Sequence, residues 1–275
     1  MSDSILITGC SSGIGYTCAH ALQQHGYRVI ASCRHPEDVT RLQQEGLECI
    51  QLDLADRHSI EQAVAAVTAL TNGKLFALFN NGAYGQPGAL EDISTDVLRT
   101  QFESNFFGWH QLTTSLLPMM REHGRGRIIQ NSSVLGIVAL KFRGAYNASK
   151  FAIEGWTDTL RLELADTDIH ISLIEPGPIE SAFRQNALKA IEQNVDVNNS
   201  IFRQAYTTQL DRLKRPNGDG KFTLPATAIV KPLLHALQSP RPRARYRVTT
   251  PTKISALLKR GLPTRYLDRV LLRND

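Results

Sequence analysis

The chain has 275 residues, of which 42% are hydrophobic and 21% are charged, and its formal net charge is +5. These values are typical of one large globular domain and exclude a chain that is disordered throughout. Much of the basic excess lies late in the sequence without a recognisable nucleic-acid-reading element, so we expect a solvated surface and no nucleic-acid partner.

The four cysteines, Cys10, Cys18, Cys33 and Cys49, have neither metal-site spacing nor a Cys-x-x-Cys pattern. We therefore expect buried reduced thiols, no metal site and a cytoplasmic location. The first residues, MSDS, lack the basic and apolar regions of a signal peptide. No apolar run approaches the roughly 20 residues that span a bilayer, so we expect a soluble protein.

Strand-like and helix-like segments alternate along residues 5–176. We expect strands at residues 5–8, 27–33, 47–54, 74–81, 126–133 and 169–176, and helices at residues 14–24, 36–45, 57–70, 94–123 and 145–166. The helix at residues 94–123 is expected to break near Gly108 and Pro118. Strands that are apolar throughout belong to a parallel sheet covered on both faces. The sequence therefore predicts an α/β fold with a doubly wound parallel sheet, Rossmann-like, in a single domain over residues 1–275.

The alternation ends after Pro176. Residues 182–225 are polar and helix-prone, and we expect a helical insertion that acts as a substrate lid. Residues 245–251 are a candidate last strand. Residues 252–275 form a basic amphipathic tail, which either lies on an anionic membrane surface or packs on the body or a neighbouring subunit; we favour packing.

Apolar residues of the insertion allow two interpretations. They either line an apolar substrate pocket or form the inner face of two packed helices, and their periodicity favours the second interpretation. The residues concerned are Ala182, Phe183, Leu188, Ile191, Phe202 and Tyr206.

Three glycines join the first strand to the first helix in the pattern Gly9-x3-Gly13-x-Gly15. In such sheets ligands bind outside the carboxyl ends of the strands. Glycine permits a tight turn and the close approach of a pyrophosphate, and the following helix offers free N–H groups and a positive dipole end. The turn therefore favours a dinucleotide, although a loop that needs only flexibility has the same pattern.

The end of the second strand favours NADP over NAD. This strand ends in Ser32-Cys33-Arg34, without the carboxylate that normally holds the ribose hydroxyls of NAD. The Arg34 guanidinium can pair with a 2′-phosphate, and the hydroxyls of Ser11 and Ser12 can add donors. NAD remains the second choice, because Glu37 and Asp38 follow closely and an arginine at a strand end is often only solvated.

Three segments, TGCSSGIG, FNNGA and SSVLGIVALKFRGAYNASK, resemble the short-chain dehydrogenase/reductase family in order along residues 4–181. The resemblance implies a dinucleotide-binding fold and hydride transfer to or from a carbonyl. Within the family, the chain looks most like hydroxysteroid and retinol dehydrogenases and related bacterial aldehyde reductases. That likeness implies a lipophilic aldehyde, ketone or alcohol as substrate.

The resemblance assigns catalytic roles to four residues. Tyr146 and Lys150 look like the catalytic pair, and their spacing of four places them on one helix face. A nearby lysine cation lowers the pKa of a tyrosine, so Tyr146 would exchange a proton with the substrate oxygen. Ser133, 13 residues before the tyrosine and followed by Gly136, is favoured over Ser132 as the group that steadies this oxygen. Asn105 matches the asparagine that holds a proton-relay water.

The resemblance also implies cofactor contacts outside the glycine turn and the catalytic pair. Asp53 looks like the residue that contacts adenine, Asn80 would lie beside the adenosine ribose, and residues 176–179 would order the carboxamide. Gly82-Ala83 reverses the usual order of these two residues, and Ser181 replaces a more usual threonine. The full set of expected cofactor residues is Gly9, Ser11, Ser12, Gly13, Ile14, Gly15, Arg34, Asp53, Leu54, Asn80, Tyr146, Lys150, Pro176, Gly177, Ile179 and Ser181.

We therefore expect an NADP-dependent oxidoreductase that acts on a small-molecule carbonyl or alcohol and, by family habit, forms a homo-oligomer. The alternative is a regulatory sensor that binds NADP on the same fold without the chemistry. The intact set of Ser133, Tyr146 and Lys150 argues against a sensor, which has no need of an activated phenol.

Overall fold

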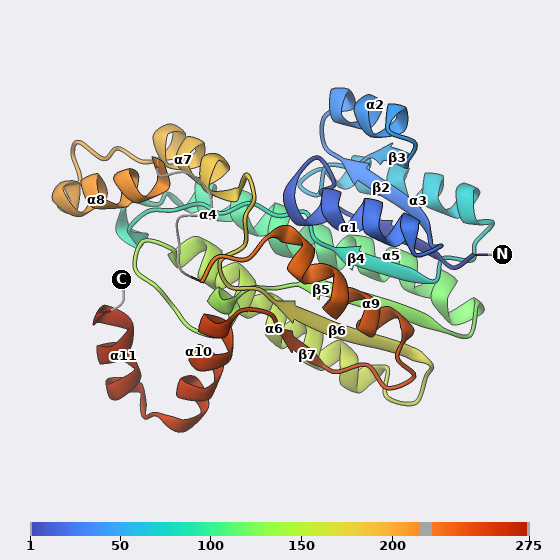
Figure 1. Cartoon of the computed structure of the whole chain (residues 1–275). Coiled ribbons are helices and arrows are strands. Elements are labelled where there is room, and N and C mark those ends of the chain that lie inside the picture. Colours follow the sequence, from blue (N-terminus) through green and yellow to red (C-terminus); the bar gives the residue numbers. More distant parts are fainter. Residues whose placement is uncertain (1, 215–221, 274–275) are drawn as a thin grey trace.

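The computed structural model describes residues 2–214 and 222–273. Its described residues form one sheet of seven parallel strands in the order β3-β2-β1-β4-β5-β6-β7 (Figure 1). The strands are β1 (Ser4–Ile7), β2 (Arg28–Cys33), β3 (Glu48–Gln51), β4 (Ala77–Asn80), β5 (Gly126–Asn131), β6 (Ile169–Glu175) and β7 (Arg245–Arg247). This arrangement confirms the predicted doubly wound, Rossmann-like sheet in a single domain.

Two hydrophobic cores cover the two faces of the sheet. On one face, α1 (Gly13–Gln24), α2 (Pro36–Gln44) and α9 (Val230–Gln238) pack through side chains such as Leu22, Leu42 and Leu233. On the other face lie α3 (Arg57–Thr71), α5 (Gly108–Glu122) and α6 (Gly144–Glu163). Because every strand residue of β1 and β4 is buried, both faces need apolar side chains, which explains the continuous apolar runs.

The long helical segment predicted at residues 94–123 differs from the prediction. It consists of α4 (Thr95–Phe102), a π-helical turn (Glu103–Phe107) and α5, so the irregularity lies just before Gly108. Pro118 lies inside α5 and does not end it, so the predicted break there is wrong. Pro118 sits in a helix whose buried residues, such as Leu116 and Met120, anchor it on the core, which outweighs the lost backbone hydrogen bond.

Several other boundaries differ. The predicted strand at residues 47–54 is longer than β3, because Leu52 and Leu54 are buried in the core beyond the paired residues. Helix α9 was not predicted; Pro232 lies in its first turn, where a proline is tolerated. The four cysteines are buried free thiols, as predicted.

The predicted insertion is helical. It contains α7 (Phe183–Asn194) and α8 (Arg203–Lys214), which lie beyond the carboxyl ends of the strands (Figure 1). Their shared core includes Ile191 and Tyr206, with Leu188 and Phe202 partly buried against it. Residues 215–221 of the predicted insertion lie outside the described residues.

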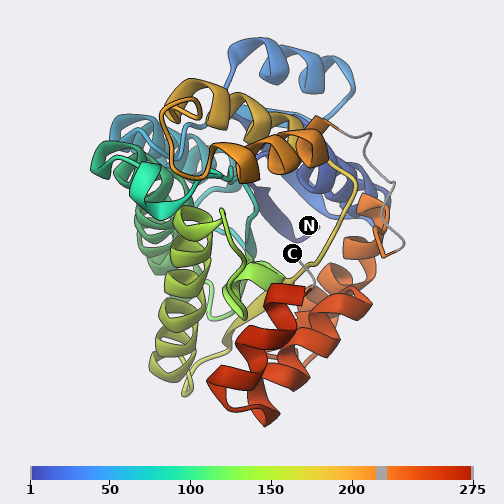
Figure 2. The ribbon, with the colours of Figure 1, turned by 90° about the vertical axis from the view of Figure 1, so that its left-hand side faces the viewer.

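The predicted tail is a pair of helices, α10 (Thr250–Gly261) and α11 (Thr264–Arg273), separated at Pro263 (Figure 2). Ala256 and Leu267 are buried, while Leu257 and Leu272 are exposed. Residues 274–275 lie outside the described part. The tail thus packs partly on the described body, as favoured, and the alternative of membrane contact is untested. Among the described helices, none is long and apolar enough to cross a membrane.

Candidate active site

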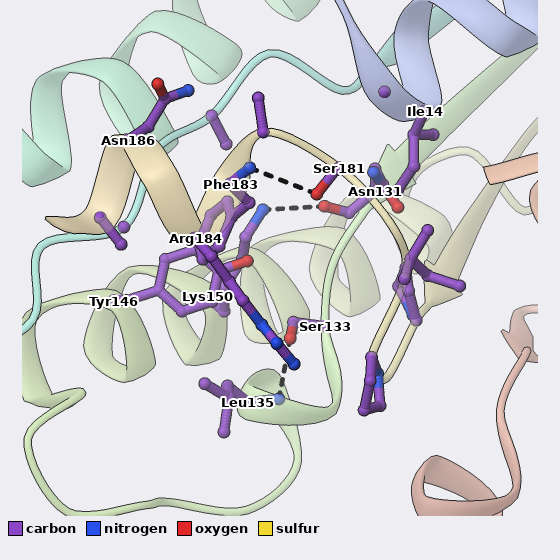
Figure 3. A pocket seen from close by; sticks show the side chains of 18 of the residues that line it. Ile14, Asn131, Ser133, Leu135, Tyr146, Lys150, Ser181, Phe183, Arg184 and Asn186 are labelled. Carbon is purple, nitrogen blue, oxygen red and sulfur yellow. Dashed lines mark hydrogen bonds between the residues drawn. The ribbon is translucent and has the colours of Figure 1, made fainter. Parts of the chain in front are cut away.

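A cavity of about 390 Å³ opens at the carboxyl ends of the central strands. Its walls come from the segments after β1, β4, β5 and β6, from Tyr146 and Lys150 on α6, and from the start of α7 (Figure 3). The strand order reverses between β1 and β4, and ligands of doubly wound sheets bind at such a switch point. The volume suits a ligand site.

The glycine turn after β1 forms one end of this cavity. Gly9 has a φ of +70°, a left-handed conformation that other residues rarely adopt. A Cβ on Gly15 would lie 2.2 Å from the Gly9 carbonyl oxygen, so only glycine fits there. Ser12 precedes α1 without a side-chain cap, which leaves the first N–H groups of the helix to a ligand. The turn is therefore shaped as a cradle for phosphate groups.

Two asparagines connect this turn to the catalytic lysine. Asn81 donates from Nδ2 to the carbonyl oxygens of Thr8 (2.9 Å) and Gly9 (3.2 Å), and its Oδ1 accepts from Asn131 Nδ2 at 2.8 Å. The Asn131 carbonyl oxygen accepts from Lys150 Nζ at 2.8 Å. From the sequence alone, neither asparagine is assigned a role. The only signal for Asn81 is the pair of adjacent asparagines in FNNGA, and Asn131 has no such signal. The buried Asn131 Oδ1 has no partner within the described chain.

Ser133 and Tyr146 meet at the inner end of the cavity. Ser133 Oγ accepts from the Leu135 N–H at 3.1 Å, which leaves its own hydrogen available as a donor. Burial raises the pKa of the Tyr146 phenol, and its hydrogen bond with Ser133 acts in the opposite direction. Phe183 lies against the Tyr146 ring, with the ring centroids 5.2 Å apart. The pair can therefore present a hydroxyl and a phenol to one substrate oxygen.

Lys150 lies behind this pair and is 1% exposed. Its Nζ lies 4.3 Å from the Trp109 ring centroid and 5.6 Å from the Tyr146 ring centroid. Burial lowers its pKa to about 7, and the charge of Glu154 acts in the opposite direction. The expected lowering of the Tyr146 pKa by Lys150 is thus not found in this structure, because burial dominates for both groups.

A buried ionic network, which sequence reasoning missed, adjoins Lys150. Ser132 Oγ donates to Glu154 Oε1 at 2.5 Å, and Arg245 Nε donates to Glu154 Oε2 at 3.1 Å. Arg245 also contacts Glu175 Oε1 at 3.0 Å. Burial raises the pKa of Glu154 to about 7. Both serines line the cavity, but Ser132 is engaged with Glu154, whereas Ser133 is hydrogen-bonded with Tyr146.

Asn105 lies in the π-helical turn and is fully buried. Its Oδ1 accepts from the Tyr84 N–H (3.1 Å), and its Nδ2 donates to the Tyr84 carbonyl oxygen (2.9 Å) and to Ser149 Oγ (3.3 Å). Its side chain thus holds the segment after β4. The role in a proton relay stays a prediction.

The structure brings most of the predicted cofactor residues to the cavity but not all. Those that line it are Gly9, Ser11, Ser12, Gly13, Ile14, Tyr146, Lys150, Pro176, Gly177, Ile179 and Ser181, whereas Gly15, Arg34, Asp53, Leu54 and Asn80 do not. Asn80 is buried and donates to Thr113 Oγ1 at 2.9 Å, and Asn81 lines the cavity instead. Asp53 Oδ1 accepts from the Ala55 N–H at 2.9 Å.

Two arginines flank the glycine turn on the β2 side. Arg34 is exposed at the end of β2 and contacts the neighbouring His35. Arg41 Nη2 donates to the Ser11 carbonyl oxygen at 2.7 Å and to Asp38 Oδ1 at 2.9 Å. Arg41 was not predicted. Arg41 therefore contacts the glycine turn directly, whereas Arg34 directly follows β2, the strand that pairs with β1.

The sequence model described as short chain dehydrogenase matches residues 3–192, about two thirds of the chain. The chain belongs to the short-chain dehydrogenase/reductase family. A similar protein is the uncharacterized oxidoreductase YbbO of Escherichia coli K12, 43% identical over 272 residues, which cover 98% of this chain and 94% of the relative. Human 17-beta-hydroxysteroid dehydrogenase type 1 is 32% identical, covering 89% of this chain and 77% of the relative.

Solved members of the family share the fold. A short-chain dehydrogenase/reductase from Burkholderia phymatum in complex with NAD has a TM-score of 0.79 and 24% identity, covering 94% of this chain and 92% of that one. An actinorhodin polyketide ketoreductase with NADPH has a TM-score of 0.71 and 26% identity, covering 90% of this chain and 95% of that one. These structures therefore support the fold of the parallel sheet and its covering helices.

The residues present fit the nicotinamide dinucleotide of this family. The glycine turn provides the space that a Cβ would fill, and the uncapped start of α1 provides N–H donors. Asn131 offers an unpartnered acceptor, and Lys150, whose Nζ donates to the Asn131 carbonyl oxygen, offers a donor beside it. The chain is an oxidoreductase of this family that uses a nicotinamide cofactor and acts on alcohol or carbonyl groups.

Proposed function

We propose that this oxidoreductase is NADP-dependent, that it acts on a lipophilic aldehyde or ketone or on the matching alcohol, and that Tyr146 exchanges the proton. The main support is the convergence of Tyr146, Ser133 and Lys150 in one cavity that begins at the glycine turn. When bound, the nicotinamide would supply or accept the hydride at the substrate carbon.

In the direction of reduction, Ser133 donates a hydrogen bond to the carbonyl oxygen and Tyr146 gives it a proton. A buried phenol with a raised pKa keeps its proton until the oxygen becomes basic, which suits a general acid. In its charged form, Lys150 would stabilise the resulting phenolate and would hold the ribose of the bound cofactor. The Trp109 face and the Asn131 carbonyl oxygen fix the position of Nζ.

The choice of NADP rests on the end of β2. The strand ends at Cys33 and is followed by Arg34, with no acidic residue at this end. Among the described residues, Arg34 has no acidic partner. Arg41 adds a second guanidinium beside Ser11, although Asp38 and Glu45 partly neutralise it. A 2′-phosphate beside these arginines would gain charge-assisted hydrogen bonds that a 2′-hydroxyl cannot match.

The outer cavity supports a substrate with apolar parts. Of the apolar lid residues singled out in the sequence, Ala182 and Phe183 line the cavity, together with Leu135, Leu140 and Leu213. Ile191, Phe202, Tyr206 and Leu188 form the inner face of the packed helices. The pocket interpretation therefore applies to Ala182 and Phe183, and the interpretation as an inner helix face applies to the other four residues.

The test measures consumption of NADPH and NADH with aldehydes and ketones from short-chain to steroid-like. We expect turnover with NADPH, and a loss of roughly a hundredfold or more in kcat for Tyr146→Phe with NADPH binding retained. Faster turnover with NADH would refute the proposed pairing of Arg34 with a 2′-phosphate, but it would not contradict the proposed proton exchange by Tyr146. Tight NADPH binding without turnover across the panel would favour the regulatory sensor.

A further inference from the structure

We propose that the substrate carries a carboxylate in addition to its reacting carbonyl or alcohol group, and that Arg184 and Arg143 bind this carboxylate. The inference deepens the proposed function and rests on it, because it names the class of compound that the same cavity takes. Three observations support it: the position of Arg184, the position of Arg143 and the charge of the cavity lining.

Arg184 is the second residue of α7 and lines the cavity. In Figure 3 its side chain extends from α7 across the site, in the direction of Ser133 and Leu135. It is only partly exposed, and within the described chain it has neither a hydrogen-bond nor an ion-pair partner. A guanidinium that is partly removed from water gains from an anionic partner, because a buried charge is costly unless it is paired.

Arg143 lies at the start of α6, three residues before Tyr146, and lines the same cavity. Its guanidinium donates to the Phe142 carbonyl oxygen at 3.1 Å and to Gln209 Oε1 of α8 at 3.4 Å. The backbone at Arg143 is fixed by a bridge to Gly88. The second cation is therefore held between the body and the lid, next to the catalytic tyrosine in sequence.

The lining of the cavity is positively charged. Its described residues include three cationic side chains, Arg143, Lys150 and Arg184, but no aspartate or glutamate. A cleft lined by one sign of charge concentrates ligands of the opposite sign. Planar guanidiniums match the two oxygens of a carboxylate. Apolar neighbours such as Phe183 and Leu140 leave room for the carbon chain of an amphiphilic acid.

The cofactor phosphates have donors elsewhere, in the glycine turn and at the start of α1. Arg143 belongs to the segment that leads into α6 and contacts α8, not the turn after β1. Binding of the pyrophosphate by Arg184 is the competing explanation for its position, and the experiment is designed to separate the two.

The experiment compares acids with matched esters as substrates. The pairs are para-carboxybenzaldehyde with methyl para-formylbenzoate, and azelaic semialdehyde with its methyl ester. We expect kcat/KM to favour the acid over the ester by about a hundredfold, which corresponds to two charge-assisted contacts of about tenfold each. Arg184→Gln and Arg143→Gln should each reduce this ratio by about tenfold, and Arg184→Lys should restore part of it. Lys189→Gln, which removes an exposed charge from the same helix, should leave the ratio unchanged.

A binding measurement separates this inference from the catalytic proposal. By calorimetry, azelate should bind the cofactor-saturated protein at least tenfold more tightly than its neutral diamide, and Arg184→Gln should remove the difference. Azelate binding without turnover of any aldehyde would refute the proposed reaction but keep the anion site. Equal binding of azelate and diamide, or ester turnover that matches the acid, would overturn the inference. So would an Arg184→Gln protein that loses NADPH affinity with an unchanged acid-to-ester ratio.

Discussion

Lys150 and Glu154 lie one turn apart on α6 and share a buried environment. Burial lowers the pKa of Lys150 to about 7 and raises the pKa of Glu154 to about 7. The negative charge of Glu154 favours the charged form of Lys150, while Ser132 and Arg245 favour the charged form of Glu154. The charge on the catalytic lysine near neutral pH therefore depends on a carboxylate that does not line the cavity.

The first prediction concerns Glu154→Gln. The amide keeps the size of the side chain but removes the charge that holds the pKa of Lys150 up. That pKa should fall further, so the alkaline limb of the pH profile of kcat/KM should move to lower pH by about one unit. A pH series of kcat/KM in the reduction direction measures the shift.

Asp158→Asn is the matched control for this prediction. Asp158 also accepts from Arg245, at 2.7 Å, but it is not among the groups that shift the pKa of Lys150. This variant should therefore keep the wild-type profile. An unchanged profile in Glu154→Gln, or equal shifts in both variants, would show that Glu154 supports Arg245 and not the charge of Lys150.

The second prediction concerns Arg34→Ala. The side chain is exposed at the end of β2, so its loss should not disturb the core. Loss of one charge-assisted contact with a 2′-phosphate should lower kcat/KM for NADPH by roughly ten- to a hundredfold and leave NADH almost unaffected. Steady-state kinetics with both cofactors measures this, and Arg34→Lys, which keeps a charge, should lie between. Equal losses for the two cofactors would place Arg34 outside the phosphate site.

At the scale of the element, the β1–α1 turn is limited by close backbone packing. A Cβ at position 15 would lie 2.2 Å from the Gly9 carbonyl oxygen and 2.6 Å from Asn81 Nδ2. The third prediction is that Gly15→Ala moves α1 away from the turn and weakens NADPH binding by at least about tenfold. Fluorescence titration of NADPH measures the loss of affinity.

Gly155→Ala is the control for this substitution. Gly155 lies on the exposed side of α6, and nothing would contact its added methyl group within 4 Å. Alanine is the better helix former, so this variant should bind NADPH normally and gain about 0.5–1 kcal/mol of stability. If Gly15→Ala keeps its affinity for NADPH, the close packing of Gly15 against the Gly9 carbonyl oxygen is not required for cofactor binding.

The lid illustrates what elements can and cannot be predicted. Its helical character follows from composition, but the division of its apolar residues depends on where the lid meets the body. Tyr206 is fully buried because its hydroxyl accepts from the Ala89 N–H at 2.8 Å and donates to Asp92 at 2.7 Å. Both partners precede it by more than a hundred positions in the chain. Periodicity within one helix carries no information on such contacts.

At the scale of the whole molecule, the parts of the site that follow local pattern were predictable. The parallel sheet, the glycine turn and the spacing of Tyr146 and Lys150 are local features. The link from Asn81 through Asn131 to Lys150, and the ion pair of Glu154 with Arg245, join segments that are distant in sequence. Single polar residues of this kind have no local signal, so only the folded sheet reveals that they act together.

The last prediction concerns the stability of the folded chain and its dependence on pH. The pKa of Lys150 is about 7 in the folded state, against 10.5 for a free lysine, which applies to the unfolded chain. Between these values the unfolded chain binds the extra proton, so the free energy of unfolding rises with pH from about 7 to about 10.5. Lys150→Met has no such group. Its free energy of unfolding should therefore exceed that of the wild type by roughly a few kcal/mol at pH 7. The lost hydrogen bond to Asn131 reduces this advantage by about 1 kcal/mol. The advantage should be smaller at pH 9.5.

Urea unfolding of the protein without cofactor at the two pH values measures this difference, and Lys189→Met, on the exposed side of α7, should show none. An advantage of Lys150→Met that does not change with pH would mean that Lys150 keeps an ordinary pKa despite its burial. The expected result would connect stability to catalysis: the variant should gain stability while losing turnover. Such a result would show that Lys150 is kept for catalysis at a cost in stability, because an apolar side chain would be more stable in this place beside Trp109 and Tyr146.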